Sequence, residues 1–276
     1  MSGIEKQETK ICGWPSAKAV LDHRLKSVQR LYFTADMRKH LGSYCSELAK
    51  NKRSYAEKSW TELTKMARDD EHDGIVVAAD TIRPIQYKPK FLAEWQKAGE
   101  SVIIIDHLAS CRQLGRIVRS AACFGVKKII VSENTAKWIQ ATKYHLEAKG
   151  ATEHVRFYQV ATIRPLLKPL NEAFITLFLG GEGAQKTTHF RKPIHAPGRP
   201  NALIVSDGSG KDDNKVAASC AHRLKVDSPT NQALQISLEE TTLVVLAWLY
   251  GAAADAKQSS HFRLKKKETS TPTSKK

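Results

Sequence analysis

The sequence lacks the motifs and long apolar segments that mark several large classes of protein. Its five cysteines are scattered and none forms a CxxC pair, so neither a zinc ribbon nor a disulfide framework is supported. No HExxH, DxDxDG or GxSxG motif is present and the ten histidines show no metal-ligand spacing, so we predict that no metal is bound. The longest apolar run, residues 243–254, is too short to span a bilayer.

Acidic residues are also scarce relative to basic ones. The chain has 44 Lys+Arg against 28 Asp+Glu, a formal net charge of +16. Such a surface favours polyanionic partners, nucleic acid before an anionic membrane; a basic surface that only keeps the chain soluble is the alternative. Unpaired cysteines fit a reducing compartment, and the polar first ten residues contain no apolar signal-peptide core, so we expect a cytoplasmic protein.

Two glycine-rich stretches fail the tests for phosphate-binding loops. GGEGAQ, residues 180–185, lacks the third glycine of a dinucleotide fingerprint. SDGSGKDD, residues 206–213, has Val205 where a P-loop has its first glycine and Asp212 in place of the Ser or Thr that would hold Mg²⁺. These failures disfavour an unrelated α/β nucleotide enzyme. Both stretches nevertheless follow predicted strands, where the backbone could approach a ligand closely.

From residue 102 onward, apolar runs suited to strands alternate with helical segments. The predicted strands are residues 102–106, 127–131, 155–160, 174–179, 202–206 and 224–226. The predicted helices are residues 112–124, 136–148, 163–170, 214–222 and 234–252. This order predicts an α/β fold with a parallel sheet covered on both faces, in which ligands bind at the carboxyl ends of the strands.

The first part of the chain has the pattern of a smaller α/β unit. Helices are predicted at residues 16–25, 35–51 and 59–69, and strands at residues 28–34 and 74–80. Ser59 and Glu62 have the spacing of a capping box. We predict a loose leader at 1–11, a first domain at 12–82, a linker at 83–98, a second domain at 99–255 and a disordered basic tail at 256–276.

Three arginines share one face of the predicted helix after the first strand of the second domain. Arg112, Arg116 and Arg119 follow the spacing i, i+4, i+7, whereas the apolar residues of the helix face the core. We predict that these arginines face a nucleic acid; an exposed basic face without a ligand is the alternative. His107 follows the same strand, and we interpret it as a loop residue rather than a functional one.

The segment IDHLASCRQLGRIVRSAACFGVKKIIV resembles the first motif of the SpoU-type (TrmH-like) RNA 2'-O-ribose methyltransferases of the SPOUT superfamily. The matching residues are Asp106, Gly115, Arg119, Ala121, Phe124 and Gly125. EAKGATEHV and FITLFLGGEGA resemble later family segments in the same order. Upstream, GWPSAKAVLDHRLKSVQRLYF and EHDGIVVA resemble the small L30e-like RNA-binding domain that many members carry, so the resemblance covers about residues 12 to 252.

The resemblance implies a parallel sheet with a C-terminal deep trefoil knot and an N-terminal L30e-like domain. It also implies a homodimer that binds S-adenosyl-L-methionine and RNA, either rRNA or tRNA, with no membrane partner. The residues implied to contact RNA are Arg112, Arg116 and Arg119. The residues implied to bind the cofactor are Leu179, Gly180, Val205, Ser206, Asp207, Gly208, Val226 and Leu234. Those implied to act in catalysis are Arg119, Gln113, Gln235 and Ser237. The family assigns proton removal to the arginine that Arg119 matches, but a guanidinium is a very poor base, so we assign Arg119 a positioning and charge role.

All three family motifs are altered in this chain. Gln113 stands in place of the Asn of the first motif, and Asp207 in place of the Glu of the second. In the third, Gln235 replaces Asn and Glu239 replaces Ala, whereas Ser237 is retained. Two hypotheses therefore stay open: an active RNA 2'-O-methyltransferase, and a catalytically impaired relative that acts as an RNA-binding or ribosome-assembly factor.

Overall fold

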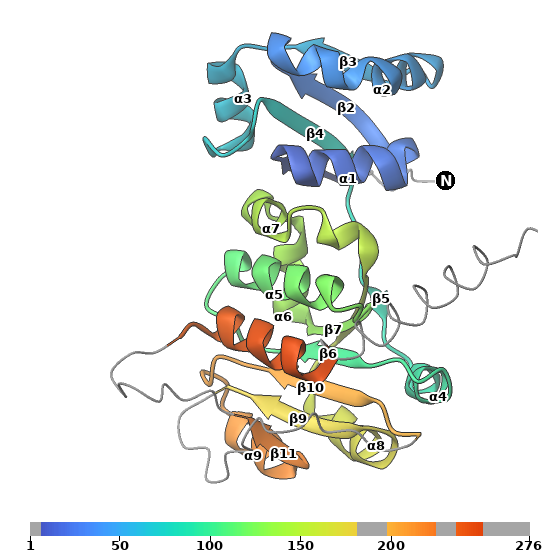
Figure 1. Cartoon of the computed structure of the whole chain (residues 1–276), viewed down its shortest axis with the longest axis vertical. Helices are drawn as coiled ribbons and strands as arrows, with labels where there is room; N and C mark the ends of the chain where they lie inside the picture. The colour runs from blue at the N-terminus through green and yellow to red at the C-terminus, as the bar shows by residue number, and fades with distance from the viewer. Residues whose placement is uncertain (1–6, 181–197, 225–235, 251–276) are drawn as a thin grey trace, which may run out of the picture.

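The protein consists of two α/β units, one above the other along the long axis of the molecule (Figure 1). It is described here from a computed structural model, which describes residues 7–180, 198–224 and 236–250. The smaller unit holds a four-stranded sheet and the larger unit a seven-stranded one. No helix within the described ranges is long and apolar enough to cross a membrane.

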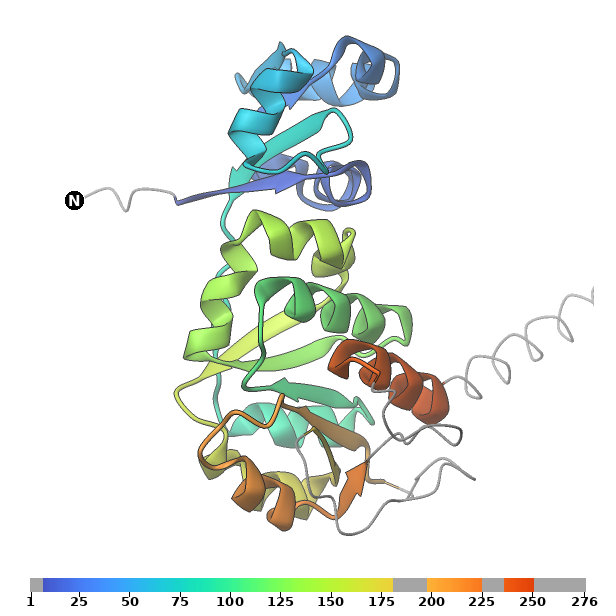
Figure 2. The same ribbon diagram turned by 90° about the vertical axis from the view of Figure 1, so that its left-hand side faces the viewer.

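The N-terminal sheet has the strand order β1-β4-β2-β3. Its strands are β1 (Glu8–Cys12), β2 (Val28–Phe33), β3 (Ser54–Glu57) and β4 (Ile75–Asp80). Strand β4 pairs antiparallel with both β1 and β2, and β2 pairs parallel with β3. Figure 2 shows β1 lying next to β4 at the edge of this sheet. The prediction of a loose leader at 1–11 is therefore wrong for residues 8–11, which are held in the sheet by β4.

Three α-helices accompany this sheet, and their ends follow from local sequence. They are α1 (Trp14–Arg24), α2 (Arg38–Lys50) and α3 (Trp60–Ala67). Helix α3 begins with the predicted capping box, in which the Ser59 hydroxyl accepts from the Glu62 backbone N–H and the Glu62 carboxylate accepts from the Ser59 backbone N–H. Strand β3 was not predicted, because three of its four residues are exposed and no buried alternation marks it.

The larger sheet is entirely parallel, with the strand order β11-β9-β10-β6-β7-β8-β5. Its strands are β5 (Ile85–Gln86), β6 (Val102–Ile105), β7 (Lys128–Ser132), β8 (Arg156–Val160), β9 (Ile175–Leu179), β10 (Asn201–Val205) and β11 (His222–Leu224). The predicted α/β fold with a parallel sheet is thus confirmed. The path of the chain through residues 225–235, on which the trefoil knot depends, lies outside the described residues.

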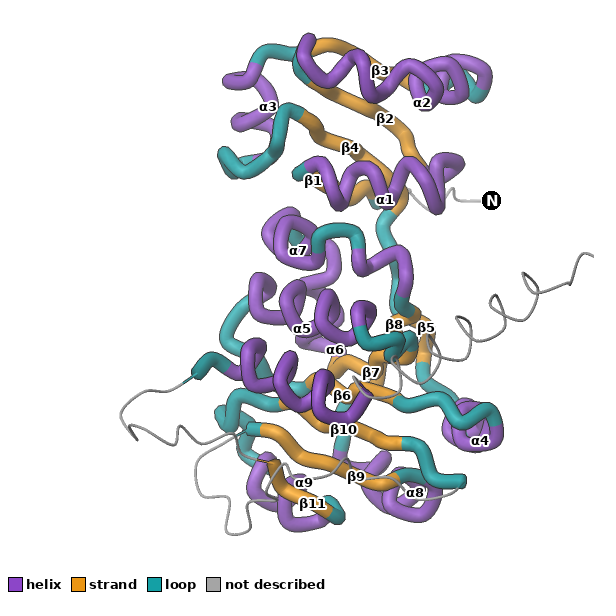
Figure 3. The backbone as a smooth tube through the Cα atoms, in the orientation of Figure 1, coloured by secondary structure: helices purple, strands orange, loops and turns teal. Residues whose placement is uncertain are grey.

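Helices cover both faces of this sheet, as Figure 3 shows. They are α4 (Lys90–Lys97), α5 (Cys111–Cys123), α6 (Glu133–Ala136), α7 (Thr142–Ala148), α8 (Leu167–Ala173), α9 (Asp213–Ser219) and a last helix at residues 238–250. Strand β6 shows how the two cores arise: Ile103 and Ile105 join the cluster that contains α5, whereas Val102 and Ile104 join the cluster that contains α4.

Two predicted segments of the larger unit are corrected by the structure. The linker at 83–98 contains β5, which pairs with β8, and α4, whose Leu92 and Trp95 are buried in the core. Most of this segment therefore belongs to the second domain. The single helix predicted at 136–148 is divided into α6, a 3₁₀ turn and α7, because the backbone of Ala141 is extended.

The two units are joined by buried polar contacts between α1 and the region around α7. The Ser16 hydroxyl donates to the His145 carbonyl at 2.6 Å. Arg24 Nε donates to both carboxylate oxygens of Glu153, at 2.9 and 2.8 Å. Since the Glu153 side chain is only 6% exposed and its charge is paired, these contacts hold the N-terminal unit in one position on the larger one.

Candidate cofactor and RNA site

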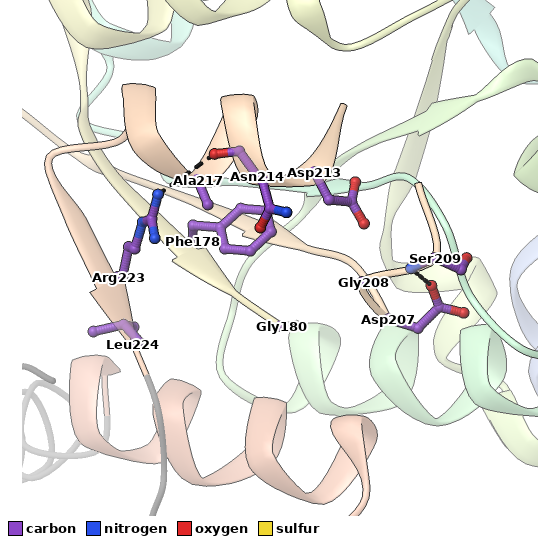
Figure 4. Close-up of a pocket in the computed structure, with 10 residues that line it drawn as sticks. All are labelled: Phe178, Gly180, Asp207, Gly208, Ser209, Asp213, Asn214, Ala217, Arg223 and Leu224. Atoms are coloured by element: carbon purple, nitrogen blue, oxygen red, sulfur yellow. Dashed lines mark hydrogen bonds between the residues drawn. The ribbon is translucent and has the colours of Figure 1, made fainter. Parts of the chain in front are cut away.

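A pocket of about 470 Å³ lies where strands β9 and β10 end (Figure 4). Its lining comes from the ends of these strands, the loop after β10, helix α9 and strand β11: Phe178, Gly180, Asp207, Gly208, Ser209, Asp213, Asn214, Ala217, Arg223 and Leu224. This is the carboxyl edge of the parallel sheet, where the strand pattern predicted a ligand. The volume falls in the usual range for a small-molecule site.

Glycine at position 180 lets the chain after β9 pass against the loop after β10. Gly180 has φ +134°, and a Cβ there would lie 1.7 Å from the Ser206 carbonyl oxygen. No side chain can be accommodated at that distance, so the backbone itself forms this wall of the pocket. Leu179 and Val205 pair in register, and their side chains are buried in the core, so only their backbone can face a ligand.

The loop after β10 is shaped by its own hydrogen bonds. The Asp207 carboxylate accepts from the Ser209 backbone N–H at 2.9 Å, and Gly208 has φ +86°. The Asp207 backbone N–H donates to the His107 carbonyl at 3.0 Å, which ties this loop to the one after β6. Ser206, Asp207 and Gly208, all predicted from the family resemblance, therefore lie together in one turn at the pocket.

Asp213 fixes the position of this loop from the first turn of α9. Its Oδ2 atom accepts from the Ser206 hydroxyl at 2.7 Å and from the Gly210 backbone N–H at 3.1 Å. Asp213 is buried, yet it also lines the pocket. Sequence reasoning missed this residue, because its only signal was an acidic side chain three positions after a glycine.

Asp106 and Asp213 both lie close to His107. The His107 Nδ1 atom is 3.3 Å from the Asp106 carboxylate and 3.8 Å from the Asp213 carboxylate. Burial raises the pKa of Asp106. Ligand atoms of the three residues lie within 4.8 Å of one another, a spacing that could hold a metal ion. The prediction that no metal is bound stays a prediction. His107 lies exposed in the loop after β6, and our interpretation of it as a loop residue rather than a functional one also stays a prediction.

The first turn of α5 presents Gln113 in a fixed orientation. Its backbone N–H donates to the Ser110 cap hydroxyl at 3.2 Å. Its side-chain oxygen accepts from the Ala109 backbone N–H at 2.9 Å, and its Nε2 donates to Glu239 at 3.0 Å. The amide is thus held at both ends, by the loop before α5 and by the last helix.

Glu239 also binds one of the three predicted RNA-contacting arginines. Arg116 Nη1 donates to Glu239 at 3.1 Å, and Arg116 Nε donates to Glu147 at 3.0 Å. Burial acts to raise the pKa of Glu239, but the hydrogen bonds from Gln113 and Arg116 outweigh it and hold that pKa below its ordinary value. Glu239 is therefore a charged partner at this site, and no local sequence pattern indicates which groups it contacts.

The three arginines of α5 differ in their partners within the chain. That they contact RNA stays a prediction. Arg112 is placed among three carboxylates, 2.8 Å from Glu147, 3.3 Å from Asp69 and 3.6 Å from Glu71. Arg112 and Arg116 are thus neutralised by their own chain. Arg119 is exposed, forms no ion pair within the part of the chain that the structure describes, and lines a second pocket against α1.

The remaining predicted residues lie around the last helix. Ser237 caps this helix, since its hydroxyl accepts from the Glu240 backbone N–H at 3.3 Å and donates to the Glu240 carboxylate at 2.8 Å. Val226, Leu234 and Gln235 lie outside the described residues. The roles of all the predicted site residues stay predictions.

Residues 100–234 match the model of the SpoU rRNA Methylase family. This part of the chain is a SpoU-type methylase domain. The match begins just before β6 and covers the strands whose carboxyl ends form the pocket. The resemblance predicted from the first motif is therefore confirmed.

Two curated relatives resemble the chain over part of its length. An uncharacterized tRNA/rRNA methyltransferase of Haemophilus influenzae is 25% identical over 167 residues, which make up 60% of this chain and 46% of that protein. The chain thus spans less than half the length of this relative. The 23S rRNA (guanosine-2'-O-)-methyltransferase RlmB of Bordetella pertussis is 22% identical over 180 residues, 65% of this chain and 73% of RlmB.

A solved structure shares the fold along most of the chain. The SpoU methyltransferase AviRb of Streptomyces viridochromogenes, solved in complex with the cofactor AdoMet, superposes with a TM-score of 0.62. The match covers 90% of this chain and 91% of AviRb at 13% identity. At that identity the likeness shows the fold alone, and it extends to the N-terminal unit as well as the SpoU domain.

Proposed function

We propose that the protein transfers a methyl group from S-adenosyl-L-methionine to a ribose 2'-hydroxyl of rRNA or tRNA. The observation that carries this proposal is the pocket at the ends of β9 and β10, which is lined by Gly180 and Gly208 and lies within a SpoU domain. The activity in the name of RlmB and the cofactor bound to AviRb support the reaction and its donor.

The residues that line the pocket suit this cofactor. S-adenosyl-L-methionine carries an ammonium and a sulfonium charge together with a carboxylate, and the pocket offers Asp207, Asp213 and Arg223. Gly180 and Gly208 leave backbone groups open to a ligand, and a site that reads a ligand through its backbone tolerates side-chain change. We propose that Val226 and Leu234 complete the site from the part of the chain outside the described residues.

Methyl transfer moves a CH₃ group from sulfur to the ribose 2'-oxygen while the hydroxyl proton leaves for a base. The cofactor supplies the methyl group, and the chain has to orient the ribose and accept the proton. We propose that Gln113, Gln235 and Ser237 orient the reacting groups, and that Arg119 holds RNA by its charge. Asp106 and His107 are proton acceptors at the same edge of the sheet.

One observation favours the second hypothesis, a relative that binds RNA without turnover. Glu239 stands at an alanine position of the third motif, and its carboxylate accepts hydrogen bonds from both Gln113 and Arg116. A hydrogen bond to a charged group contributes about 1.5–3 kcal/mol, so RNA would have to displace this contact before it could use the Gln113 amide.

We further propose a cytoplasmic homodimer with the C-terminal trefoil knot of the family and an L30e-like RNA-binding N-terminal domain. Exposed apolar side chains on and beside the last helix support the dimer: Ile236, Leu243 and Val244 are 46%, 44% and 43% exposed. Three large apolar side chains in one short segment are typical of a surface covered by a partner subunit.

Calorimetric titration with S-adenosyl-L-methionine tests the proposed site directly. We expect micromolar binding by the full chain and its loss in Gly208→Arg, where a long side chain would fill the pocket. Gly99→Arg is the matched control, because Gly99 also has a positive φ, +67°, but has no atom within 4 Å of its Cβ position. The control adds the same charge and similar backbone strain far from the pocket and should bind the cofactor normally.

A transfer assay then separates the two hypotheses. Radiolabelled methyl from the cofactor should appear in RNA. The RNA chain should resist alkaline hydrolysis at the modified position, because a 2'-O-methyl group blocks that cleavage. Absence of cofactor binding at millimolar concentration, in a folded protein that still binds RNA, would refute the methyltransferase and leave the RNA-binding relative.

A further inference from the structure

A second pocket of about 390 Å³ lies in the groove between the N-terminal unit and the SpoU domain. Helix α1 forms one wall, the last turns of α5 another, and the turn after α7 the third. We call it the interdomain groove, and its lining residues are Pro15, Lys18, Ala19, Asp22, His23, Arg119, Ala122, Cys123, Ala148, Lys149, Gly150, Ala151 and His154.

Basic side chains dominate the polar lining of this groove. Lys18, Arg119 and Lys149 contribute three positive charges and are all exposed. Asp22 is the single carboxylate in the lining, and it pairs with Lys18 at 2.5 Å. Arg119 and Lys149, which come from different elements, form no ion pair among the residues that the structure describes, so both cations remain open to an anion.

Two imidazole rings extend the groove beside these cations. His23 and His154 come from opposite units, and their ring centroids lie 4.7 Å apart with the planes at 76°. Both side chains are exposed. Histidine rings serve as stacking surfaces for unpaired bases in RNA-binding proteins. A groove with cations next to exposed rings matches the two parts of a nucleotide, its phosphate and its base.

The walls of the groove are fixed relative to each other. A Cβ on Gly150 would lie 2.7 Å from the Ala19 Cβ and 2.9 Å from the Pro15 carbonyl oxygen, so the turn after α7 touches α1 directly. The Arg24–Glu153 ion pair, in which the Glu153 side chain is only 6% exposed, closes the same junction. A pre-formed groove binds a ligand without a further ordering cost.

We propose that the interdomain groove binds a single-stranded segment of the RNA substrate, with phosphates on Arg119 and Lys149 and a base against the His23–His154 pair. This inference rests on the proposed function, because that function makes the bound RNA a substrate. Binding in the groove can nevertheless be measured without methyl transfer. It assigns the N-terminal unit a defined part in RNA binding, since α1 supplies one wall and one ring.

Lys149→Gln tests the electrostatic half of the proposal, with Lys97→Gln as the matched control on an exposed position of α4 outside the groove. The probe is a fluorescent oligouridylate of about 12 nucleotides, followed by anisotropy in the full chain. We expect Lys149→Gln to weaken binding about three- to tenfold. The slope of log affinity against log salt concentration should decrease by the amount of about one phosphate contact. The control should change affinity less than about twofold. Equal effects of the two variants would overturn the proposal.

The double variant His23→Ala/His154→Ala tests the stacking half. Heparin is the comparison ligand, because it carries dense negative charge but no bases. The double variant should weaken oligouridylate binding about tenfold and leave heparin binding within about twofold, whereas Lys149→Gln should weaken both. Unchanged oligouridylate binding in the double variant would refute the role of the rings.

Cys123 provides a test of location in the unmodified protein. Cys123 is exposed, whereas the other four cysteines are buried or partly buried, and it lines the interdomain groove. Saturating oligouridylate should slow its reaction with a maleimide several-fold, and no protection would place the RNA elsewhere. Weaker RNA binding in Lys149→Gln with normal S-adenosyl-L-methionine binding supports the groove whether or not methyl transfer occurs, so the two proposals fail separately.

Discussion

Gln113 and Glu239, 126 residues apart in the sequence, are joined by a hydrogen bond of 3.0 Å from the Gln113 Nε2 atom to the Glu239 carboxylate. The bond connects the first turn of α5 with the last helix, and Arg116 binds the other oxygen of the same carboxylate. In the predicted motif assignment Gln113 stands at an Asn position and Glu239 at an Ala position, and in the structure the longer amide reaches the carboxylate.

Replacing Glu239 by Ala should lower the free energy of unfolding by about 1–2 kcal/mol, because two charge-assisted hydrogen bonds at a partly exposed position are lost. It should also free the Gln113 amide, so that methyl transfer to RNA rises at least several-fold if the protein is an active enzyme. Glu172→Ala, on an exposed position of α8, is the control and should change stability by less than about 0.5 kcal/mol. A stable Glu239→Ala variant with lower transfer would show that the carboxylate itself takes part in the reaction.

Gly180→Ala should destabilise the protein far more than Gly99→Ala. Both positions have positive φ, +134° and +67°, but only the added Cβ at position 180 meets a neighbour, the Ser206 carbonyl oxygen at 1.7 Å. Backbone strain alone costs about 1–2 kcal/mol for alanine, and the forced separation of two packed loops adds about 1–3 kcal/mol. Thermal unfolding measures the difference, and calorimetry should show that Gly180→Ala also loses S-adenosyl-L-methionine. Equal melting temperatures would contradict the close approach.

Arg24→Ala should separate the two units of the chain, whereas Arg30→Ala should not. Arg24 and its partner Glu153 are 18% and 6% exposed, so removal of the guanidinium leaves a buried carboxylate without its charged partner, at a cost of about 2–4 kcal/mol. Arg30 pairs with Glu8 at the surface, where such a pair contributes about 0–1 kcal/mol. Limited proteolysis should cut Arg24→Ala between residues 80 and 90 first. If Arg24→Ala resisted the protease as well as Arg30→Ala does, the junction would not depend on the Arg24–Glu153 pair.

The elements that sequence reasoning predicted well are those buried on both sides. Strands β6, β7, β9 and β10 are continuous apolar runs, and each was predicted to within about two residues. Strand β1 has exposed residues alternating with buried ones and was taken for a leader, since its partner β4 lies more than 60 residues away. Helix α4 was missed because Pro84 and Pro89 suggested a linker.

The candidate site could be predicted only as far as backbone position determines it. The loop at Ser206 to Gly208 follows β10 at the carboxyl edge of the sheet, where its place after a predicted strand put it, and its role in cofactor binding stays a prediction. The partners of the arginines could not be predicted, since Asp69, Glu71 and Glu147 come from two units and meet Arg112 only after folding. Helical spacing shows which side chains share a face, but it does not show what lies opposite that face.

His145 should make stability depend on pH below neutrality. It is buried in α7 at the junction of the two units, and this burial lowers its pKa from 6.5 to about 3, with a smaller effect from the Arg24 charge. The unfolded chain therefore takes up a proton as the pH falls below 6.5, while the folded chain does not. Because the unfolded state binds more protons, the free energy of unfolding decreases as the pH is lowered from 6.5 to about 3.

The expected loss is about 2 kcal/mol between pH 6.5 and about pH 5, since each unit below the unfolded pKa contributes about 1.4 kcal/mol. In His145→Gln the slope of the free energy of unfolding against pH should become shallower, because the side chain no longer titrates. Burial also lowers the pKa of His72, so some slope should remain. His40→Gln, at an exposed position, should retain the slope of the unmodified protein. Chemical denaturation at several pH values measures all three. A parallel slope in His145→Gln would show that this residue gains no proton on unfolding, and the pH dependence would then have to come from His72 and the carboxylates.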